Sequence, residues 1–197
     1  KEKTIIFDGA MGTLIMSAGI ESIKSPILLN VEKPDLVVAF HKQYYAAGAD
    51  VVLTNTFSGN PLKLEAEGIE AQMEVLNRQA AELAKAACPE GKFVAGDIGP
   101  SGKTLPPVGD SSPEEMQDAF YRQAKVLIEG GVDLILIETM YSLDEAVAAV
   151  HAVRKESDIL LAASMTFNLT EMGYYTIMGE TVDRCASTLS EAGADII

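Results

Sequence analysis

The sequence predicts an α/β fold built on a parallel sheet, and two observations support this prediction. Short apolar runs rich in β-branched residues alternate with segments of helical periodicity along the whole chain. Three segments, 47–52, 130–135 and 192–197, also share a pattern in which a glycine follows a helical segment and an aspartate opens an apolar run. The glycine suits the left-handed position just past a helix end. Regular strand–helix alternation of this kind builds parallel sheets.

The individual elements follow from the same patterns. The apolar runs are typical of strands buried on both faces, and they predict strands at 4–7, 50–55, 93–97, 134–138 and 159–166, with a sixth opening near 195. Helices are predicted between them at 34–47, 65–87, 113–129, 143–156 and 181–192. Two helix starts are well marked, because Ser112 precedes a proline and two acids and Ser142 has the spacing of a capping box.

Two architectures fit this order of elements: an open doubly wound sheet and a (β/α)8 barrel. An open six-stranded sheet accommodates the strand count, but 195–197 then end inside a strand with no helix to cover it. The pattern therefore favours the barrel, which takes roughly 250 residues when complete. We expect 1–197 to form one domain that supplies about the first five and a half βα units of a TIM barrel and is incomplete at its C-terminus.

Composition excludes several classes of protein. The 197 residues hold 15 Lys and Arg against 29 Asp and Glu, a net charge of −14 with no basic cluster, which argues against a nucleic-acid partner. No apolar run is long enough to cross a membrane, and no signal peptide is recognisable. The cysteines, Cys88 and Cys185, fit neither a disulfide framework nor a metal motif. We therefore expect a cytoplasmic protein.

Polar residues gather where the predicted strands end. Asp8, Asn55, Asp97, Glu138 and Thr166 each follow or close an apolar run. Because the carboxyl ends of parallel strands meet on one rim, which carries the active site in barrels, we expect a functional site there. Three carboxylates on one rim repel a phosphate and suit a cation, either a substrate ammonium or a metal.

Alternatives to an ammonium site remain open from the residues alone. A Mg²⁺ site built from Asp8, Asp97 and Glu138 would suit an aldolase-like barrel. The two histidines, His41 and His151, fall on outer helices, where we expect satisfied or solvent-facing imidazoles. We also expect Cys185 to be a small buried apolar residue.

Four motifs in register resemble the homocysteine S-methyltransferase family. They are FDGAMGT at 7–13, TNTF at 54–57, GDIGP at 96–100 and IET at 137–139, each at a predicted strand end. The resemblance covers essentially the whole chain and is greatest to the homocysteine-binding module of cobalamin-dependent methionine synthases. It implies the (β/α)8 barrel and methyl transfer to the thiol of homocysteine, which forms methionine.

The resemblance also implies roles for particular residues. Asp8 and Glu138 would bind the substrate ammonium, and Asn55, Thr56 and Thr166 would line the pocket. In the family, a zinc ion held by three cysteine thiolates activates the substrate thiol. We expect those ligands beyond residue 197, so the chain alone is expected to be inactive.

The methyl donor and acceptor follow less directly. Methylcobalamin is the expected donor, carried by a corrinoid-binding domain or protein beside a methyl-donor domain. A corrinoid-linked module with another thiol acceptor is the alternative, because the segment 168–175 is less typical of the family.

Overall fold

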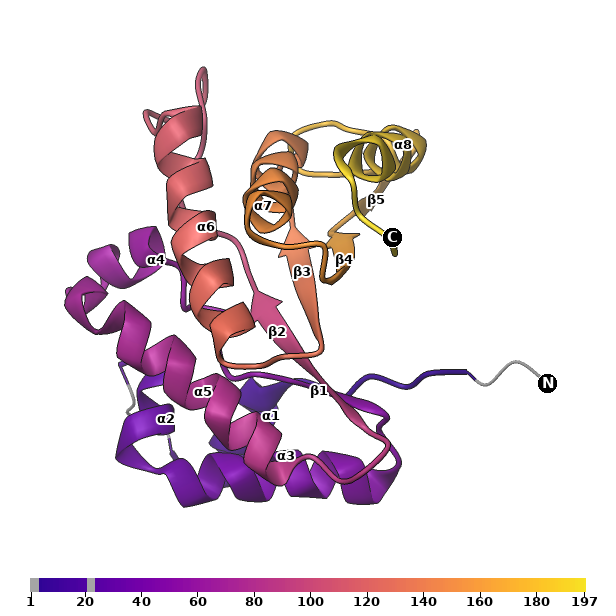
Figure 1. The fold of residues 1–197 in the computed structure, drawn as a ribbon. Helices are drawn as coiled ribbons and strands as arrows, with labels where there is room; N and C mark the ends of the chain where they lie inside the picture. The colour runs from indigo at the N-terminus through magenta and orange to yellow at the C-terminus, as the bar shows by residue number, and fades with distance from the viewer. Residues whose placement is uncertain (1–3, 21–23) are drawn as a thin grey trace.

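The computed structural model describes residues 4–20 and 24–197, and its centre is a parallel sheet of four strands (Figure 1). The strands are β1 (Val51–Leu53), β2 (Phe93–Ile98), β3 (Leu134–Met140) and β4 (Leu160–Met165). Their order in the sheet is their order in the chain, and every pair is parallel. Sequential parallel order is the arrangement of a barrel, whereas a doubly wound sheet reverses its strand order part-way.

Each edge of this sheet is extended by one more parallel bridge. Phe7 pairs with Val51 beside β1, and Ile196 pairs with Ala162 beside β4. Six strand positions therefore follow one another in chain order, as the barrel prediction requires. The predicted strand at 4–7 is wrong in extent, because Phe7 alone makes a ladder bridge there.

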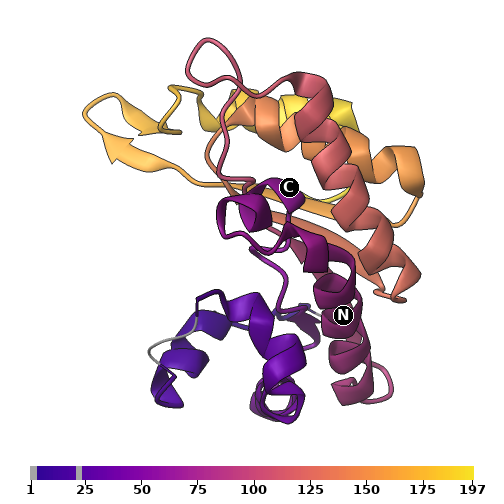
Figure 2. The same cartoon turned by 90° about the vertical axis from the view of Figure 1, so that its left-hand side faces the viewer.

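Eight α-helices lie among the described residues. They are α1 (Met11–Ser17), α2 (Leu29–Glu32), α3 (Pro34–Ala47), α4 (Pro61–Ala66), α5 (Met73–Ala87), α6 (Pro113–Glu129), α7 (Leu143–Glu156) and α8 (Val182–Ala192). Short 3-10 turns, η1 (Pro26–Leu28) and η2 (Glu70–Gln72), precede α2 and α5. The longer helices α3, α5, α6 and α7 each pack against a strand of the sheet and against a neighbouring helix (Figures 1 and 2).

The predicted helix at 65–87 is wrong as a single element. Gly68 adopts φ = 70°, a left-handed conformation that ends α4, and the chain restarts through η2 into α5. The two marked helix starts are confirmed, since the hydroxyls of Ser112 and Ser142 accept hydrogen bonds from the amides of Glu115 and Glu145. The carboxylate of Glu145 bonds to Ser101 instead of completing a capping box.

A hairpin after β4 has no counterpart in the predicted elements. It pairs β5 (Asn168–Thr170) with β6 (Gly173–Tyr175) in antiparallel register and projects from the body of the molecule (Figure 2). Its side chains are largely exposed, Met172 to 81%. Because the hairpin buries little apolar surface, its sequence lacks the apolar run that marks the other strands.

The three repeated segments build the same device at the amino end of the sheet. Their glycines, Gly48, Gly131 and Gly193, have φ values of 113°, 83° and 112°. The aspartate two residues later accepts a hydrogen bond from a backbone amide of the preceding strand position. The pairs are Asp50 with Ile6 (3.2 Å), Asp133 with Val94 (2.7 Å) and Asp195 with Leu161 (2.8 Å). We call these contacts the aspartate clasps.

Each clasp is reinforced by a salt bridge to a lysine or arginine side chain. The salt bridges are Lys92 to Asp50 (2.7 Å), Lys85 to Asp133 (3.0 Å) and Arg154 to Asp195 (2.6 Å). The repeat is therefore a structural element that joins adjacent strand positions at the end of the sheet opposite the polar loops.

Two further predictions concern side chains away from the polar rim. Cys185 is buried on α8 among apolar residues, as predicted. His41 is different, because it is fully buried on α3 and neither ring nitrogen has a hydrogen-bond partner among the described residues. Burial lowers its pKa to about 4. The prediction of a satisfied or solvent-facing imidazole is therefore wrong for His41, while His151 is exposed.

Candidate active site

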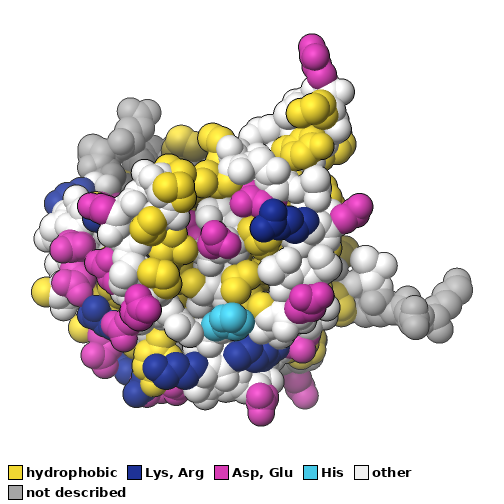
Figure 3. Space-filling view, turned by 90° about the horizontal axis from the view of Figure 1, so that it is seen from above, with side chains coloured by type: hydrophobic (Ala, Val, Ile, Leu, Met, Phe, Trp, Pro, Cys, Tyr) yellow, Lys and Arg dark blue, Asp and Glu magenta, His cyan; other side chains and the backbone are white. Residues whose placement is uncertain are grey.

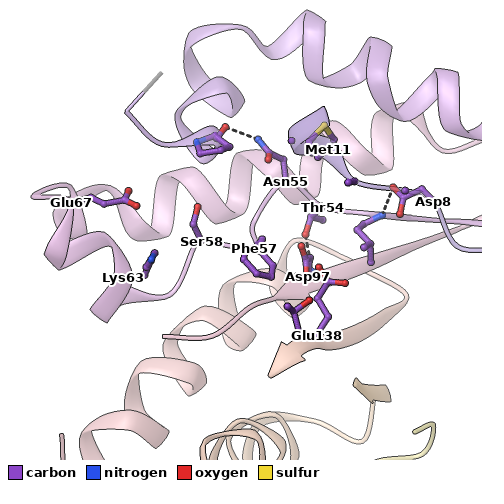
Figure 4. A pocket seen from close by; sticks show the side chains of 16 residues that line it. Asp8, Met11, Thr54, Asn55, Phe57, Ser58, Lys63, Glu67, Asp97 and Glu138 are labelled. Carbon is purple, nitrogen blue, oxygen red and sulfur yellow. Dashed lines mark hydrogen bonds between the residues drawn. The ribbon is translucent and has the colours of Figure 1, made fainter. Parts of the chain in front are cut away.

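The loops that follow the strands enclose a cavity of about 580 Å³ (Figure 4). Three carboxyl side chains from different strand positions border it: Asp8 after Phe7, Asp97 near the end of β2 and Glu138 near the end of β3. Phe57 also lines it, and Lys63 lines it at the side away from Glu138. Four of the five strand-end residues that the sequence singled out thus border one cavity at the carboxyl end of the sheet: Asp8, Asn55, Asp97 and Glu138.

Asp8 is held by one oxygen and leaves the other unpaired. Its Oδ2 accepts a hydrogen bond from the amide of Leu53 on β1 at 3.0 Å. Its Oδ1 is buried and has no partner among the described residues. Burial is the main reason that the pKa of Asp8 is raised to about 7; the Leu53 amide opposes the shift, and the nearby Glu138 contributes to it.

Asp97 and Glu138 lie side by side in this cavity (Figure 4). The Asp97 side chain is only 5% exposed, and its Oδ1 is another buried oxygen without a partner in the described chain. Burial raises the pKa of Asp97 well above its ordinary value, and the charges of Glu138 and Asp8 add to the effect. Burial also raises the pKa of Glu138.

The backbone beside Glu138 is strained. The register between β3 and β4 shifts between Ile137 and Met140, and Thr139 inside this irregularity has φ = 61°. A left-handed conformation is a genuine outlier for a β-branched residue, and such strain concentrates at functional sites. A bulge of this kind re-aims a side chain, here Glu138 at the rim of the cavity.

The electrostatics of this end of the cavity favour a cation. Among residues 4–20 and 24–197, no Lys or Arg lies within salt-bridge distance of Asp8, Asp97 or Glu138. The lining cation, Lys63, sits at the other end, beside Ser58 (Figure 4). Carboxyl groups close together in a low dielectric resist ionisation until an opposite charge arrives. An ammonium group fits these requirements.

Comparison with known proteins identifies the family. Residues 5–197 match the family model for homocysteine S-methyltransferase. The chain belongs to the homocysteine S-methyltransferase family. Members of this family transfer a methyl group to homocysteine, so the motif resemblance and the activity class that it implies are confirmed.

Solved structures agree with this assignment. The oxidized form of the homocysteine methyltransferase MmuM from Escherichia coli superposes with a TM-score of 0.78 at 25% identity, covering 96% of this chain and 70% of that one. The apo form gives 0.77 at 26% identity, with 98% and 70% covered. The carboxyl transferase domain of Rhizobium etli pyruvate carboxylase shares the fold alone, with a TM-score of 0.51 at 16% identity over 83% of this chain and 23% of that one.

Of the three residues that the family motifs predict to line the pocket, only one borders the cavity. Asn55 borders the cavity, but its amide nitrogen already donates to the carbonyl of Pro26 at 2.8 Å and to Asn30 at 3.0 Å. Thr56 is fully buried behind the lining, and Thr166 is exposed outside it. The structure thus brings Asp8, Asn55 and Glu138 to one cavity. Substrate contacts by Thr56 and Thr166 stay predictions.

The described residues do not form a metal site. Among 4–20 and 24–197, no group of three or more His, Cys, Asp or Glu side chains is arranged to hold a metal ion. Asp8, Asp97 and Glu138 therefore do not supply the ligand cluster that a Mg²⁺-dependent aldolase needs. Cys88 ends α5 and Cys185 is buried on α8, so they do not fit a zinc site either.

Sequence reasoning missed the lining residues of one segment. Ser58, Lys63 and Glu67 border the cavity from the loop after β1 and from α4. The signal was Asn60 followed by proline, because Asn60 caps α4 by accepting a hydrogen bond from the amide of Leu62 at 3.0 Å. Because α4 begins at Pro61, Lys63 lies in its first turn and borders the cavity.

The remaining surface fits the composition. On the face seen in Figure 3, Lys and Arg side chains are interspersed with Asp and Glu and do not form a basic patch. No helix among the described residues is long and apolar enough to span a bilayer.

Proposed function

We propose that this cavity binds homocysteine by its α-ammonium group, with Asp8 and Glu138 as the receiving carboxylates, for methyl transfer that forms methionine. The observation that carries the proposal is the buried, unpaired Oδ1 of Asp8, which lines the same cavity as Glu138 and feels its charge, in a cavity end that lacks a described cation. A buried unpaired carboxyl oxygen is costly, and a charged donor from the ligand relieves that cost.

The protonation state of Asp8 gives this site its chemistry. With a pKa of about 7, the free site holds a proton on Asp8 in roughly half of the molecules at neutral pH. An ammonium ligand stabilises the ionised form, so binding releases that proton to solvent. In this proposal, the acids of the cavity recognise the amino-acid end of the substrate.

We propose that the thiol end depends on groups other than the described residues. A zinc ion for thiol activation is implied by the motif resemblance, and a metallated form of MmuM also matches this chain, with a TM-score of 0.78 at 25% identity. The described residues contain no suitable set of zinc ligands. We therefore keep the prediction that the 197-residue chain alone is inactive. Methylcobalamin on a corrinoid-binding domain or protein is the proposed donor, on the strength of the motifs alone.

The test compares homocysteine with 4-mercaptobutyrate, which keeps the thiol and carboxylate but lacks the ammonium. Binding is followed by NMR titration of the 197-residue chain. We expect Asp8→Asn to weaken homocysteine binding roughly ten- to hundredfold, the range for a hydrogen bond to a charged group, and to leave 4-mercaptobutyrate unaffected. Glu65→Gln, an exposed acid on α4, is the matched control. Equal binding of homocysteine by Asp8→Asn and the unmodified chain would overturn the proposal.

A further inference from the structure

Asp97 is the most deeply buried carboxyl of the cavity. At 5% exposure it is more enclosed than Asp8 or Glu138, yet it borders the same space. Its Oδ1 has no hydrogen-bond partner among the described residues. A buried polar oxygen normally accepts a hydrogen bond. An unpaired one in a ligand cavity therefore points to a donor group on the ligand.

The main chain of Asp97 is fixed by a closed ring of hydrogen bonds. Its amide donates to Thr54 Oγ1 at 3.0 Å, and its carbonyl accepts from Thr56 Oγ1 at 2.7 Å. The two hydroxyl oxygens are 2.6 Å apart. Because the single hydroxyl proton of Thr56 goes to Asp97, Thr54 must be the donor between the two threonines. The ring therefore has one direction and no free donor.

The ring sits where β1 and β2 end side by side. Thr54 and Thr56 are 2% and 0% exposed, so water does not compete for these bonds. Gln123 on α6 adds a bond to the carbonyl of Thr56 at 2.9 Å, which ties the ring to the helix behind it. Such a network holds the Asp97 backbone in one place and aims its carboxyl at the cavity.

We propose that Asp97 is a third ammonium-binding residue of this cavity, beside Asp8 and Glu138, and that Thr54 and Thr56 are the positioning residues that hold it there. This inference rests on the proposed function. An ammonium group carries three N–H donors, and three carboxyl groups, from the first, third and fourth strand positions, border the cavity that would receive it. A two-carboxylate site would leave the third donor without a carboxylate acceptor.

The decisive variant is Asp97→Asn, titrated with homocysteine and with 4-mercaptobutyrate. We expect homocysteine binding to weaken about tenfold or more, and 4-mercaptobutyrate binding to change less than about twofold. A purely structural role for Asp97 would weaken both ligands equally, and that result would overturn the inference. Unchanged homocysteine binding by a folded Asp97→Asn protein would overturn it too.

The positioning role is tested on the ring. Thr56→Val removes the hydroxyl at nearly constant volume and should show the same selective loss for homocysteine, smaller than that of Asp97→Asn. Thr56→Ser restores the hydroxyl and should recover most of the affinity. If Asp97→Asn does not fold, this pair still decides the matter: a loss that is equal for both ligands, or that serine does not rescue, overturns the inference.

Comparison with Asp8→Asn separates the two proposals. If Asp8→Asn loses homocysteine selectively and Asp97→Asn does not, the inference about Asp97 is wrong and the proposed function stands. If neither variant distinguishes homocysteine from 4-mercaptobutyrate, or the unmodified chain binds neither, the proposed function fails and the inference fails with it.

Discussion

The carboxyl group of Asp8 should make ligand affinity depend on pH. Because its pKa in the free protein is about 7, an ammonium ligand must displace a proton below that pH. We expect the affinity for homocysteine to rise about tenfold per pH unit between pH 5.5 and 7 and to level off above pH 7. Dissociation constants from NMR titration across this range measure the slope. Asp8→Asn should flatten the profile, and a flat profile in the unmodified chain would contradict the assignment.

Thr139 gives a second prediction for a single residue. Its φ of 61° costs about 1–3 kcal/mol in a β-branched residue, whereas glycine adopts this conformation without strain. Thr139→Gly should therefore raise the free energy of unfolding by about 1 kcal/mol after the added chain entropy of glycine is subtracted. Urea unfolding measures the change.

A control distinguishes strain from side-chain loss. Thr166 is also exposed but has no positive φ. Thr166→Gly should lower the free energy of unfolding, since only the entropy cost applies there. The same sign of change at both positions would argue against stored strain at Thr139.

At the scale of single residues, prediction from sequence works best where the local sequence pattern alone determines where a side chain lies. Asp8 and Glu138 were found because an acid that ends an apolar run must lie at the rim of a parallel sheet. The sequence places Asp97 on the same cation-binding rim but does not single it out as an ammonium ligand, because its bonds to Thr54 and Thr56 depend on two strands lying side by side. His41 was misjudged because an outer helix can still bury one face against its neighbours, here α2 and α5.

At the scale of elements, the tie between Ser101 and α7 makes a testable contribution. Glu145 Oε1 accepts hydrogen bonds from the amide and the hydroxyl of Ser101, at 2.7 Å and 2.6 Å. Both residues are buried, so the tie fixes the loop after β2 against the first turn of α7. Glu145→Ala strands two buried donors, and we expect it to lower the free energy of unfolding by about 1–3 kcal/mol.

Two comparisons make that prediction specific. Glu145→Gln keeps an acceptor oxygen and should lose less than the alanine variant. Asp144→Ala removes an exposed acid from the same helical turn and should change stability by about 0.5 kcal/mol or less. Hydrogen exchange at the Ser101 amide should accelerate in Glu145→Ala alone. Equal melting of Glu145→Ala and Asp144→Ala would exclude a structural role for the tie.

Elements with strong end signals were predicted to the residue. The bounds of α3, α6 and α7 agree with the sequence, because a proline, a capping serine or a glycine marks their ends. The predicted helix at 65–87 is wrong because it runs through Gly68, whose left-handed φ of 70° ends a helix. The β5–β6 hairpin was missed because its pairing is local and its side chains are exposed.

At the scale of the whole molecule, the two ends of the sheet carry opposite kinds of acid. The aspartate clasps at the amino end pair every carboxylate with a backbone amide and a cation. The acids at the carboxyl end keep buried oxygens without partners in the described chain, at both Asp8 and Asp97. Barrels separate stability and activity in this way, at opposite ends of the strands. The separation predicts opposite effects of removing an acid from each end.

Asp133→Ala should lower stability and spare binding. It leaves the Val94 amide without its acceptor and removes the salt bridge to Lys85, at a cost of about 1–3 kcal/mol. Its distance from the cavity should leave homocysteine affinity unchanged within about twofold. Asp133→Asn retains an acceptor oxygen, so its free energy of unfolding should lie between those of Asp133→Ala and the unmodified chain. Urea unfolding measures all three.

Asp8→Asn should do the reverse. A raised folded pKa means that the native state binds more protons than the unfolded state between pH 4 and 7, so Asp8 lowers stability as pH rises through that window. At about 1.4 kcal/mol per pKa unit, the stability advantage of Asp8→Asn over the unmodified chain should grow by a few kcal/mol from pH 5 to pH 8. The same variant should bind homocysteine more weakly. If Asp8→Asn lowered stability at pH 8, or Asp133→Ala weakened binding, the acids would not be divided between the two ends of the sheet in this way.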